Sequence, residues 1–382
     1  MLVRCRRSRR TAPLLAIAAA CLCRYPPPAP AQDAAEPGTL AAVAPGGLRD
    51  PARRAGLAAH MRGIQAERRR LAVEHARPRG LPVRQELPDG VVRELADWAE
   101  GQPLYRVTLN ANAAISTGSD RILLPPYQAQ GYGGTIGVWD AGSVRATHQE
   151  FGGRVTIRDG AAPHNHSTHV GGTLGATGIV ASARGMAPQA RIDSYDWNYD
   201  LSEMTSRGAA VSGEAGKIYI SNHSYGMLSG WAYTGTPTWT WYGSGTTADG
   251  YEDDFGRYNT YARDVDALAY GAPFYAIFWA AGNDRDNNPA AGASVALSPE
   301  GETVSYSASA HPPGDGVYHG GYETIGFNAL GKNVITVGAV TDAVGSGVRT
   351  PSKASMTSFS SWGPTDDGRI KPDLVANGYY LY

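Results

Sequence analysis

The chain contains very little cysteine. Only Cys5, Cys21 and Cys23 occur, and all three fall in an N-terminal segment that we expect to be removed. A mature protein without cysteine forms no disulfide and has no thiol nucleophile. Its stability must then come from a hydrophobic core and, where they bind, from ions.

An excess of charge of either sign is also missing. The formal net charge is −1 over 382 residues, so there is no electrostatic argument for nucleic acid as a partner. A chain of this length is sufficient for one large domain together with a smaller N-terminal piece.

The apolar run near the N-terminus, residues 12–23, is too short to span a bilayer as a permanent helix. It follows a group of arginines and precedes the small-x-small pattern Ala29-Pro30-Ala31, which is the order of a secretory signal peptide. We therefore expect residues 1–31 to be a signal peptide and the protein to be secreted or periplasmic. The paired arginines also fit the twin-arginine route, and Ala18 to Cys21 loosely fits a lipoprotein signal.

Residues 32–110 form an N-terminal extension with a pattern of its own. Apolar residues recur at helical spacing from Asp50 to Ala76, and the prolines and glycine of residues 78–82 end that helix. A second short helix is expected at residues 91–99. The composition fits a propeptide, and it fits equally well a helical extension that plays no part in folding.

The remainder, residues 111–382, is expected to be the main domain, and from Gly134 onward its pattern changes to strands that alternate with helices. Short apolar segments occur at residues 135–139, 191–195, 217–221, 274–279 and 333–337. Helices are expected after His166 and at residues 258–270. This alternation predicts an α/β fold with a mainly parallel sheet. Residues 230–254 and 284–326 are expected to be irregular surface insertions around a cleft.

Three polar residues lie where chemistry is expected. In a parallel sheet the working side chains gather at the carboxyl ends of strands, and Asp140 and Asn283 both follow predicted strands. His166 opens a run of small residues that lets a helix begin close under the sheet. An orienting acid, a histidine base and an amide donor are the parts needed for acyl transfer by a serine. Each residue alone is more often a turn, cap or packing residue, so the ordered set carries the prediction.

The segments around these residues resemble those of the subtilases, the subtilisin-like serine peptidases, from about residue 131 onward. The similar segments are Gly137-Val-Trp-Asp140-Ala-Gly, His166-Ser-Thr-His-Val-Gly-Gly-Thr173, Ala280-Ala-Gly-Asn283, Phe359-Ser-Ser-Trp-Gly-Pro364 and Lys371-Pro-Asp-Leu-Val-Ala376. The resemblance implies a three-layer α/β sandwich with a mainly parallel sheet. It also implies that Asp140 orients the base His166 and that Asn283 stabilises the oxyanion.

The resemblance extends to the substrate. Ser224, Tyr225 and Gly226 stand where the family pairs its backbone with an extended polypeptide, a mode known as β-augmentation. No cofactor is then required, and we expect a monomer. Calcium is common in the family, and oxygen-bearing side chains cluster at residues 284–288, but a hydrated loop explains them equally well and no ligands are assigned.

The nucleophile is the part that the sequence does not show. In the family a Gly-Thr-Ser segment follows, and none occurs here; the chain instead reaches the apolar residues 379–382, which fit the start of a strand. We therefore expect an incomplete catalytic domain, a serine beyond residue 382 and no activity in these residues alone. Ser358, Ser360 and Ser361 are the internal alternatives, and a natural pseudoprotease is another.

Two interpretations from other classes stay open. His164, His166 and His169 are close enough in sequence to bind zinc, although Thr168 stands where the comparable zinc motif has aspartate. Alternatively, the domain holds peptides without cutting them, and the aromatic residues around Trp239 serve that binding.

Overall fold

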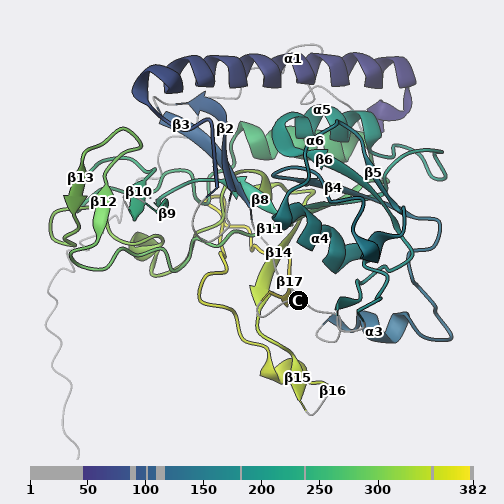
Figure 1. Cartoon of the computed structure of the whole chain (residues 1–382). Coiled ribbons are helices and arrows are strands. Elements are labelled where there is room, and N and C mark those ends of the chain that lie inside the picture. The colour runs from purple at the N-terminus through teal and green to yellow at the C-terminus, as the bar shows by residue number, and fades with distance from the viewer. Residues whose placement is uncertain are drawn as a thin grey trace, which may run out of the picture. The chain divides into compact units, whose positions relative to one another are not determined.

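Figure 1 shows the computed structural model of the protein, which describes residues 46–86, 92–99, 102–108, 117–180, 183–235, 238–345 and 348–378. The expected signal peptide at residues 1–31 and the expected strand start at residues 379–382 lie outside these ranges. Both therefore stay predictions.

The helices are α1 (Pro51–Ala76), α3 (Ser119–Ile122), α4 (Asn165–Gly175), α5 (Asp200–Arg207) and α6 (Thr260–Gly271). The strands up to the middle of the chain are β1 (Arg84–Glu86), β2 (Val92–Ala99), β3 (Gln102–Thr108), β4 (Thr135–Asp140), β5 (Val155–Ile157), β6 (Arg191–Asp196), β7 (Ile220–His223) and β8 (Tyr225–Met227). The later strands are β9 (Trp231–Tyr233), β10 (Trp239–Trp241), β11 (Ala276–Ala280), β12 (Ser294–Ala296), β13 (Thr303–Ser305), β14 (Ile335–Val340), β15 (Val344–Gly345), β16 (Val348–Arg349) and β17 (Leu374–Asn377). None of the helices within the described ranges has the length and apolar character needed to cross a membrane.

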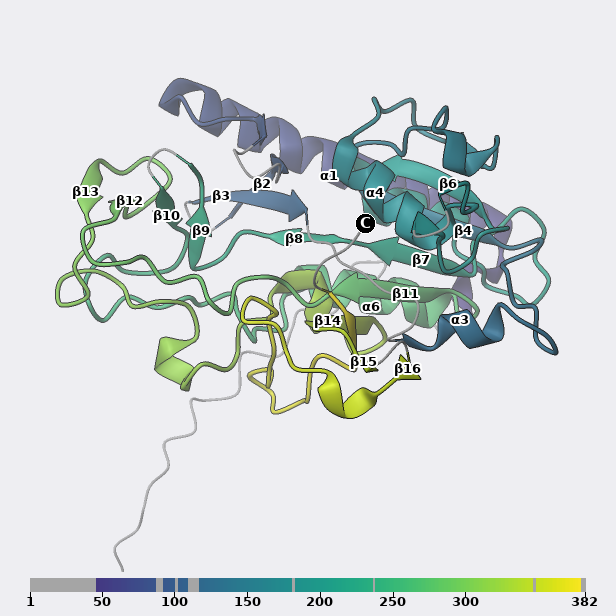
Figure 2. The same cartoon turned by 60° about the horizontal axis from the view of Figure 1, so that its bottom comes forward.

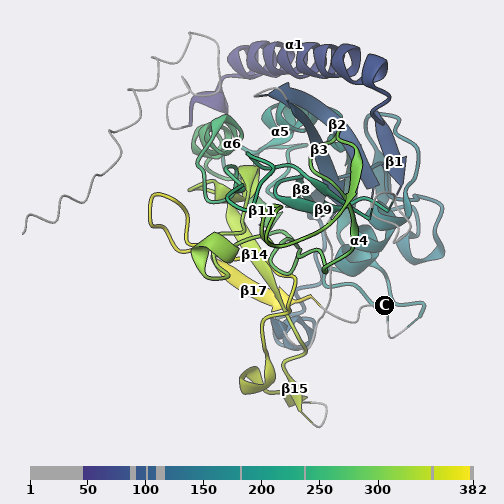
Figure 3. The ribbon, with the colours of Figure 1, turned by 90° about the vertical axis from the view of Figure 1, so that its left-hand side faces the viewer.

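Seven strands form one sheet in the order β17-β14-β11-β7-β4-β6-β5. All of its described pairings are parallel, which confirms the predicted parallel sheet. Figure 3 shows β14 and β17 together at one side. Because β4, β7 and β11 run in the same direction, their carboxyl ends lie at the same end of the sheet. Asp140 and the residues after β11 therefore lie close together there.

The sheet is covered on both faces. Along β4, Val138 and Trp139 point to opposite faces, as successive strand residues do, and both are fully buried. Val138 packs in a cluster with Val170 of α4, whereas Trp139 packs in the cluster that contains Val265 and Leu268 of α6. The two helices therefore lie on opposite faces (Figure 1), and the fold is the expected three-layer sandwich.

Helix α1 begins and ends where the sequence predicts, and it packs along α5. Asp50 caps it, because its side chain accepts a hydrogen bond from a first-turn backbone N–H at 2.9 Å. Leu57 and Met61 enter the core cluster beneath the helix. Gln65 donates a buried hydrogen bond of 2.7 Å to Asp200 at the start of α5. Figures 1 and 3 show α1 lying over α5 and α6.

The prediction of a helix at residues 91–99 is wrong, because residues 92–99 form the strand β2. The strand pairs antiparallel with β1 on one side and with β3 on the other. Its Leu95 is fully buried together with Ala72 and Ala76 of α1. Two flanking strands satisfy the backbone of β2, and this non-local pairing outweighs the helical tendency of a short segment.

Two regions expected to be irregular instead form a small sheet. Residues 230–254 and 284–306, which we call the aromatic lobe, hold four strands in the order β13-β12-β10-β9. Strands β10 and β12 pair in parallel although α6 and β11 lie between them in the sequence. Trp231, Trp241 and Tyr306 fill the core of the lobe, which lies on the left in Figure 1. Two of the tryptophans expected to offer a binding surface are therefore packing residues.

Candidate active site

Asp140 lies at the carboxyl end of β4 and is fully buried. Its Oδ1 accepts hydrogen bonds from the Ala141 N–H at 2.7 Å and from the Ser167 hydroxyl at 3.1 Å. Two donors on one oxygen hold the carboxylate in a fixed orientation. Sequence reasoning did not single out Ser167, because no pattern in the sequence distinguishes it from an ordinary helical residue.

His166 lies in the first turn of α4, as predicted. His164 caps the helix through its Nδ1, which accepts a hydrogen bond from the His166 N–H at 3.2 Å. The Nδ1 of His166 is 2.8 Å and 3.0 Å from the two carboxylate oxygens of Asp140. A carboxylate only accepts, so we assign the ring proton to Nδ1. Nε2 of His166 is then the basic nitrogen; it is buried and has no hydrogen-bond partner among the described residues.

The glycines of α4 allow the helix to lie close to its neighbours. A Cβ on Gly171 would come within 2.9 Å of the Val144 side chain, and a Cβ on Gly175 within 3.1 Å of Ile192. Gly172 meets nothing within 4 Å. Close packing therefore explains two of the three glycines, and it is these contacts that bring His166 under the sheet edge.

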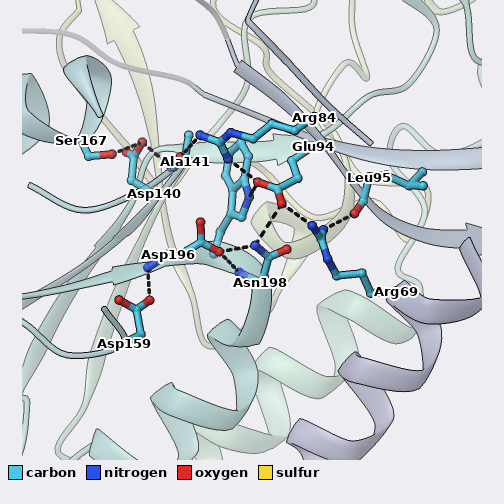
Figure 4. A network of polar contacts seen from close by, with 11 residues as sticks. Arg69, Arg84, Glu94, Leu95, Asp140, Ala141, Asp159, Ser167, Asp196 and Asn198 are labelled. Atoms are coloured by element: carbon cyan, nitrogen blue, oxygen red, sulfur yellow. Dashed lines mark hydrogen bonds and ion pairs between the residues drawn. The ribbon is translucent and has the colours of Figure 1, made fainter. Parts of the chain in front are cut away.

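A polar network links the extension to the residue next to Asp140, and Figure 4 shows it from close by. Arg84 of β1 donates to the carbonyl oxygen of Ala141 and to Glu94 of β2. Glu94 is buried; it also accepts from Arg69 of α1 at 2.5 Å and from side chains that follow β6 at 3.1 Å. Burial raises the pKa of Glu94, but the guanidinium groups of Arg69 and Arg84 outweigh burial and hold that pKa below its ordinary value.

Asn283 lies three residues beyond the end of β11 and lines a cavity of about 340 Å³. The floor of the cavity consists of Ile220, Phe278 and Val337 from three neighbouring strands of the sheet, and Val170 of α4 belongs to its wall. An amide donor thus lies beside an apolar hollow on the α4 face of the sheet. Desolvation raises the pKa of the neighbouring Asp284 carboxyl group to about 7.

The strand proposed to hold substrate is already paired. Tyr225 and Gly226 belong to β8, directly after Ser224. Strand β3 of the extension pairs with it antiparallel, with Thr108 and Val107 opposite Tyr225 and Gly226. Figure 2 shows β3 lying beside β8. The chain therefore places an extended segment of its own on the predicted substrate edge.

The three serines named as internal alternatives are not joined to His166. Ser360 is fully buried, and its Oγ accepts a hydrogen bond from the Ala339 N–H at 2.8 Å. Ser361 is also buried, and its Oγ accepts from a neighbouring backbone N–H at 3.1 Å. Ser358 is exposed. Since Nε2 of His166 has no partner within the described ranges, none of the three serves it as a nucleophile in this structure.

The described residues contain no group of three or more His, Cys, Asp or Glu side chains arranged to hold a metal ion. The zinc site considered for His164, His166 and His169 is therefore not formed. Of the oxygen-bearing side chains at residues 284–288, Asn287 donates from its Nδ2 to the Trp231 carbonyl at 2.7 Å. That contact ties a loop to the aromatic lobe, and it identifies no calcium ligand.

Comparison with known proteins gives one family. The model described as Subtilase family matches residues 135–382, and no curated protein matches the chain. Among solved structures, a cold adapted subtilisin-like serine proteinase is similar at 19% identity and a TM-score of 0.33, with 65% of this chain and 64% of that chain covered. The Clostridium perfringens CspB protease is similar at 16% identity and a TM-score of 0.41, with 70% and 81% covered. This chain thus spans less than two thirds of the cold adapted proteinase.

Proposed function

Because the chain belongs to the subtilase family, we propose that it is the precursor of a serine endopeptidase. The observation that carries the proposal is the pair formed by Asp140 and His166, with Nδ1 and Oδ1 2.8 Å apart. The other ring nitrogen, Nε2, is buried without a partner among the described residues. A histidine held in this tautomer is prepared to take the proton of a serine hydroxyl.

Each residue of the proposed site has one task. Asp140 holds the imidazole of His166 in place and stabilises the imidazolium that forms when the serine attacks the peptide carbonyl. His166 then gives that proton to the leaving amine. Asn283 donates from its side-chain amide to the oxyanion, and such a donor contributes about 3 kcal/mol of transition-state stabilisation.

We place the nucleophile, a serine, outside residues 1–382. The apolar cavity beside Asn283 supports this placement, because its floor spans neighbouring strands next to α4 and fits the packing of one further helix. A helix there would begin near the amide of Asn283. On this proposal residues 1–382 alone are inactive, and their open apolar floor makes them poorly soluble.

The substrate is proposed to be an extended polypeptide that pairs with Ser224, Tyr225 and Gly226. Main-chain pairing with a strand edge supplies affinity that does not depend on sequence, and side pockets supply preference. The antiparallel pairing of β3 with β8 supports this mode, since it demonstrates that the edge accepts an extended strand.

We propose that residues 32–110 are a propeptide and that residues 111–382 belong to the catalytic domain. While β3 occupies β8, a substrate strand has no access to that edge. Arg84 holds the extension beside Asp140 through the Ala141 carbonyl. Glu94 accepts hydrogen bonds from Trp197 and Asn198 of the catalytic domain, and Arg69 and Arg84 contact Glu94 from within the extension. Removal of the extension is then the step that opens the site.

Further properties follow from the same proposal. The signal peptide at residues 1–31 directs export, to the periplasm or the exterior, with lipid attachment at Cys21 as the alternative. The enzyme acts as a monomer and needs no cofactor for the reaction. Calcium would serve only stability, and we assign it no ligands.

A serine-directed phosphonate tests the proposal on the protein encoded by the complete reading frame. We expect it to label a single serine beyond residue 382, in a Gly-Thr-Ser segment, and mass spectrometry would locate the adduct. His166→Ala should abolish the labelling, and a metal chelator should not.

Two results would contradict the proposal. Labelling of a serine within residues 1–382 would place the nucleophile in the present chain. A complete reading frame without a Gly-Thr-Ser segment, from a protein that binds peptides and cleaves none, would establish the non-catalytic peptide-binding module instead.

A further inference from the structure

Tyr105 of β3 reaches beyond the part of β8 that pairs by strand register. The Leu228 N–H donates to the Tyr105 carbonyl at 2.8 Å, so Tyr105 lies opposite Leu228 and extends the ladder by one residue. The side chain of Tyr105 is fully buried. Residues directly opposite in an antiparallel pair share a face of the sheet, so the ring and Leu228 lie on the same side.

The ring of Tyr105 lies between two walls. One wall belongs to the extension and includes Ala72, Ala76 and Leu95, and the other belongs to the catalytic domain. Tyr105 packs in one cluster with Leu228, Ala232 and Tyr242. The Tyr242 ring meets it edge-on, with centroids 6.2 Å apart and an interplanar angle of 80°, which is a favourable arrangement of two aromatic rings. An adjoining cavity of about 240 Å³ is lined on one side by residues 79–82 of the extension and on the other by lobe residues that include Thr240.

The neighbouring position on β3 faces elsewhere. Leu104 packs with Met227 and Phe327 in a separate cluster, as expected for side chains that alternate along a strand. The pocket of Tyr105 is therefore specific to one position of the paired strand.

We propose that the wall formed by Leu228, Ala232 and Tyr242, which stays when the extension leaves, is a distal substrate subsite selective for an aromatic side chain. The proposal rests on the proposed function. A substrate strand that pairs with β8 antiparallel takes the register of β3, so its residue opposite Leu228 enters the space that Tyr105 now fills. With residue 110 counted as the first residue before the cleaved bond, this is the sixth.

The chemistry of the walls selects the side chain. Leu228 and Ala232 offer apolar contact, and Tyr242 offers a ring edge. The hydroxyl of Tyr105 donates at 2.7 Å to the Pro82 carbonyl, which belongs to the extension and leaves with it. The ring rather than the hydroxyl is thus recognised, and phenylalanine is accepted as well as tyrosine.

Two peptide substrates test the subsite in the enzyme freed of its extension by processing of the whole precursor. They are identical except for phenylalanine or alanine at the sixth residue before the cleaved bond. We expect kcat/KM to be about tenfold higher for the phenylalanine peptide, because a ring buried against apolar walls is worth roughly that factor. Tyr242→Ala should remove the preference. Tyr251→Ala, which alters an exposed tyrosine of the same lobe, should keep it.

An inhibition assay covers the case in which Tyr242→Ala does not fold. The synthetic peptide of residues 102–110 should inhibit the unaltered enzyme about tenfold more strongly than the same peptide with alanine at position 105. Equal cleavage of both substrates, or equal inhibition by both peptides, would overturn the subsite and leave the peptidase proposal intact. Failure to cleave either substrate would overturn both.

Discussion

The Asp140–His166 pair and strand β8 are held together in different ways. The two residues of the pair are 26 positions apart in the sequence. Within the described ranges, the hydrogen bonds to its carboxylate come from Ala141, His166 and Ser167. Strand β8 is completed by β3, from the N-terminal extension. The groups for chemistry are thus assembled by local elements, whereas the substrate edge is occupied by a distant segment. On our proposal, latency in this precursor is a matter of access to the site and not of a distorted pair.

A contact from the extension reaches the backbone beside the Asp140–His166 pair. Arg84 of the extension donates to the carbonyl of Ala141, directly after Asp140, and also to Glu94. Departure of the extension therefore removes a donor from the backbone beside the pair but none from its carboxylate. The comparison can be tested by altering each region while the other is observed.

The largest effect is expected from His166→Ala in the complete protein. Loss of the base should lower turnover by about 10⁴-fold or more. The pairing of β3 with β8 should persist, because His166 takes no part in it. Peptide hydrolysis measures the first effect, and hydrogen exchange of the Leu228 amide, which bonds to Tyr105, measures the second.

His169→Ala serves as the matched control one helical turn away. It should retain most of the activity, since Asp140 is bonded by His166 and not by His169. More than a few per cent of normal turnover in His166→Ala would rule out His166 as the base. A rise in exchange at Leu228 would show that the two regions are not independent.

Asn283→Ala is expected to have the next largest effect. Loss of one oxyanion donor lowers kcat by about 10²- to 10³-fold and changes KM little, because the interaction forms in the transition state. Asp286→Asn, an exposed change nearby, should leave kcat unaltered. An equal loss in the two variants would mean that this loop matters for stability and not for the oxyanion.

Glu94→Gln tests how firmly the extension keeps β3 paired with β8. Breaking a buried ion pair costs about 3 kcal/mol, which corresponds to about hundredfold faster exchange at the Leu228 amide. The His166→Ala precursor suits this measurement, because it does not process itself. Glu74→Gln, which alters an exposed ion pair on α1, the helix that carries Arg69, should change exchange little.

The pH dependence of this effect has a defined sign. The pKa of Glu94 is lowered in the folded protein. Its ion pairs and hydrogen bonds therefore contribute fully to stability above the ordinary pKa of 4.5. They are lost as the pH falls through the lower value in the folded state. In the protein that carries Glu94, protection of the Leu228 amide, corrected for intrinsic exchange, should therefore fall as the pH is lowered. In the Glu94→Gln variant, protection should show no such pH-dependent fall. A step that persists in the variant would assign it to another group.

The sequence predicted the locally determined elements around Asp140 and His166, and it failed where distant segments pair. The strand with Asp140 and the helix with His166 are local elements with a clear apolar pattern, and both are confirmed. Residues 91–99 were expected to be helical and form β2, because their partners β1 and β3 decide their conformation. The aromatic lobe was expected to be irregular and forms a sheet instead. Here too the conformation depends on distant partners, since β10 pairs with β12.

The polar contacts between the extension and the residues beside Asp140 could not be predicted from the sequence either. Nothing in the order of residues indicates that Arg84 reaches the Ala141 carbonyl or that Glu94 joins two arginines. The extension contains many arginines, but which of them are buried depends on how the extension docks. Ser167 was missed for a simpler reason, since a serine beside a catalytic histidine has no pattern that distinguishes it from a helix-forming residue.

The smallest effect is expected from Glu300→Gln, at the edge between the extension and the aromatic lobe. Glu300 pairs with Arg79 at 2.8 Å, and both side chains are about 40% exposed. Exposed pairs contribute roughly 0–1 kcal/mol, so exchange at Leu228 should rise by less than about fivefold. Replacing the glutamate instead of Arg79 leaves the stacking of Arg79 on Trp98 in place. If this variant released β3 as strongly as Glu94→Gln, the extension would be held at its exposed rim, and the buried network beside Asp140 would not be what keeps the substrate edge closed.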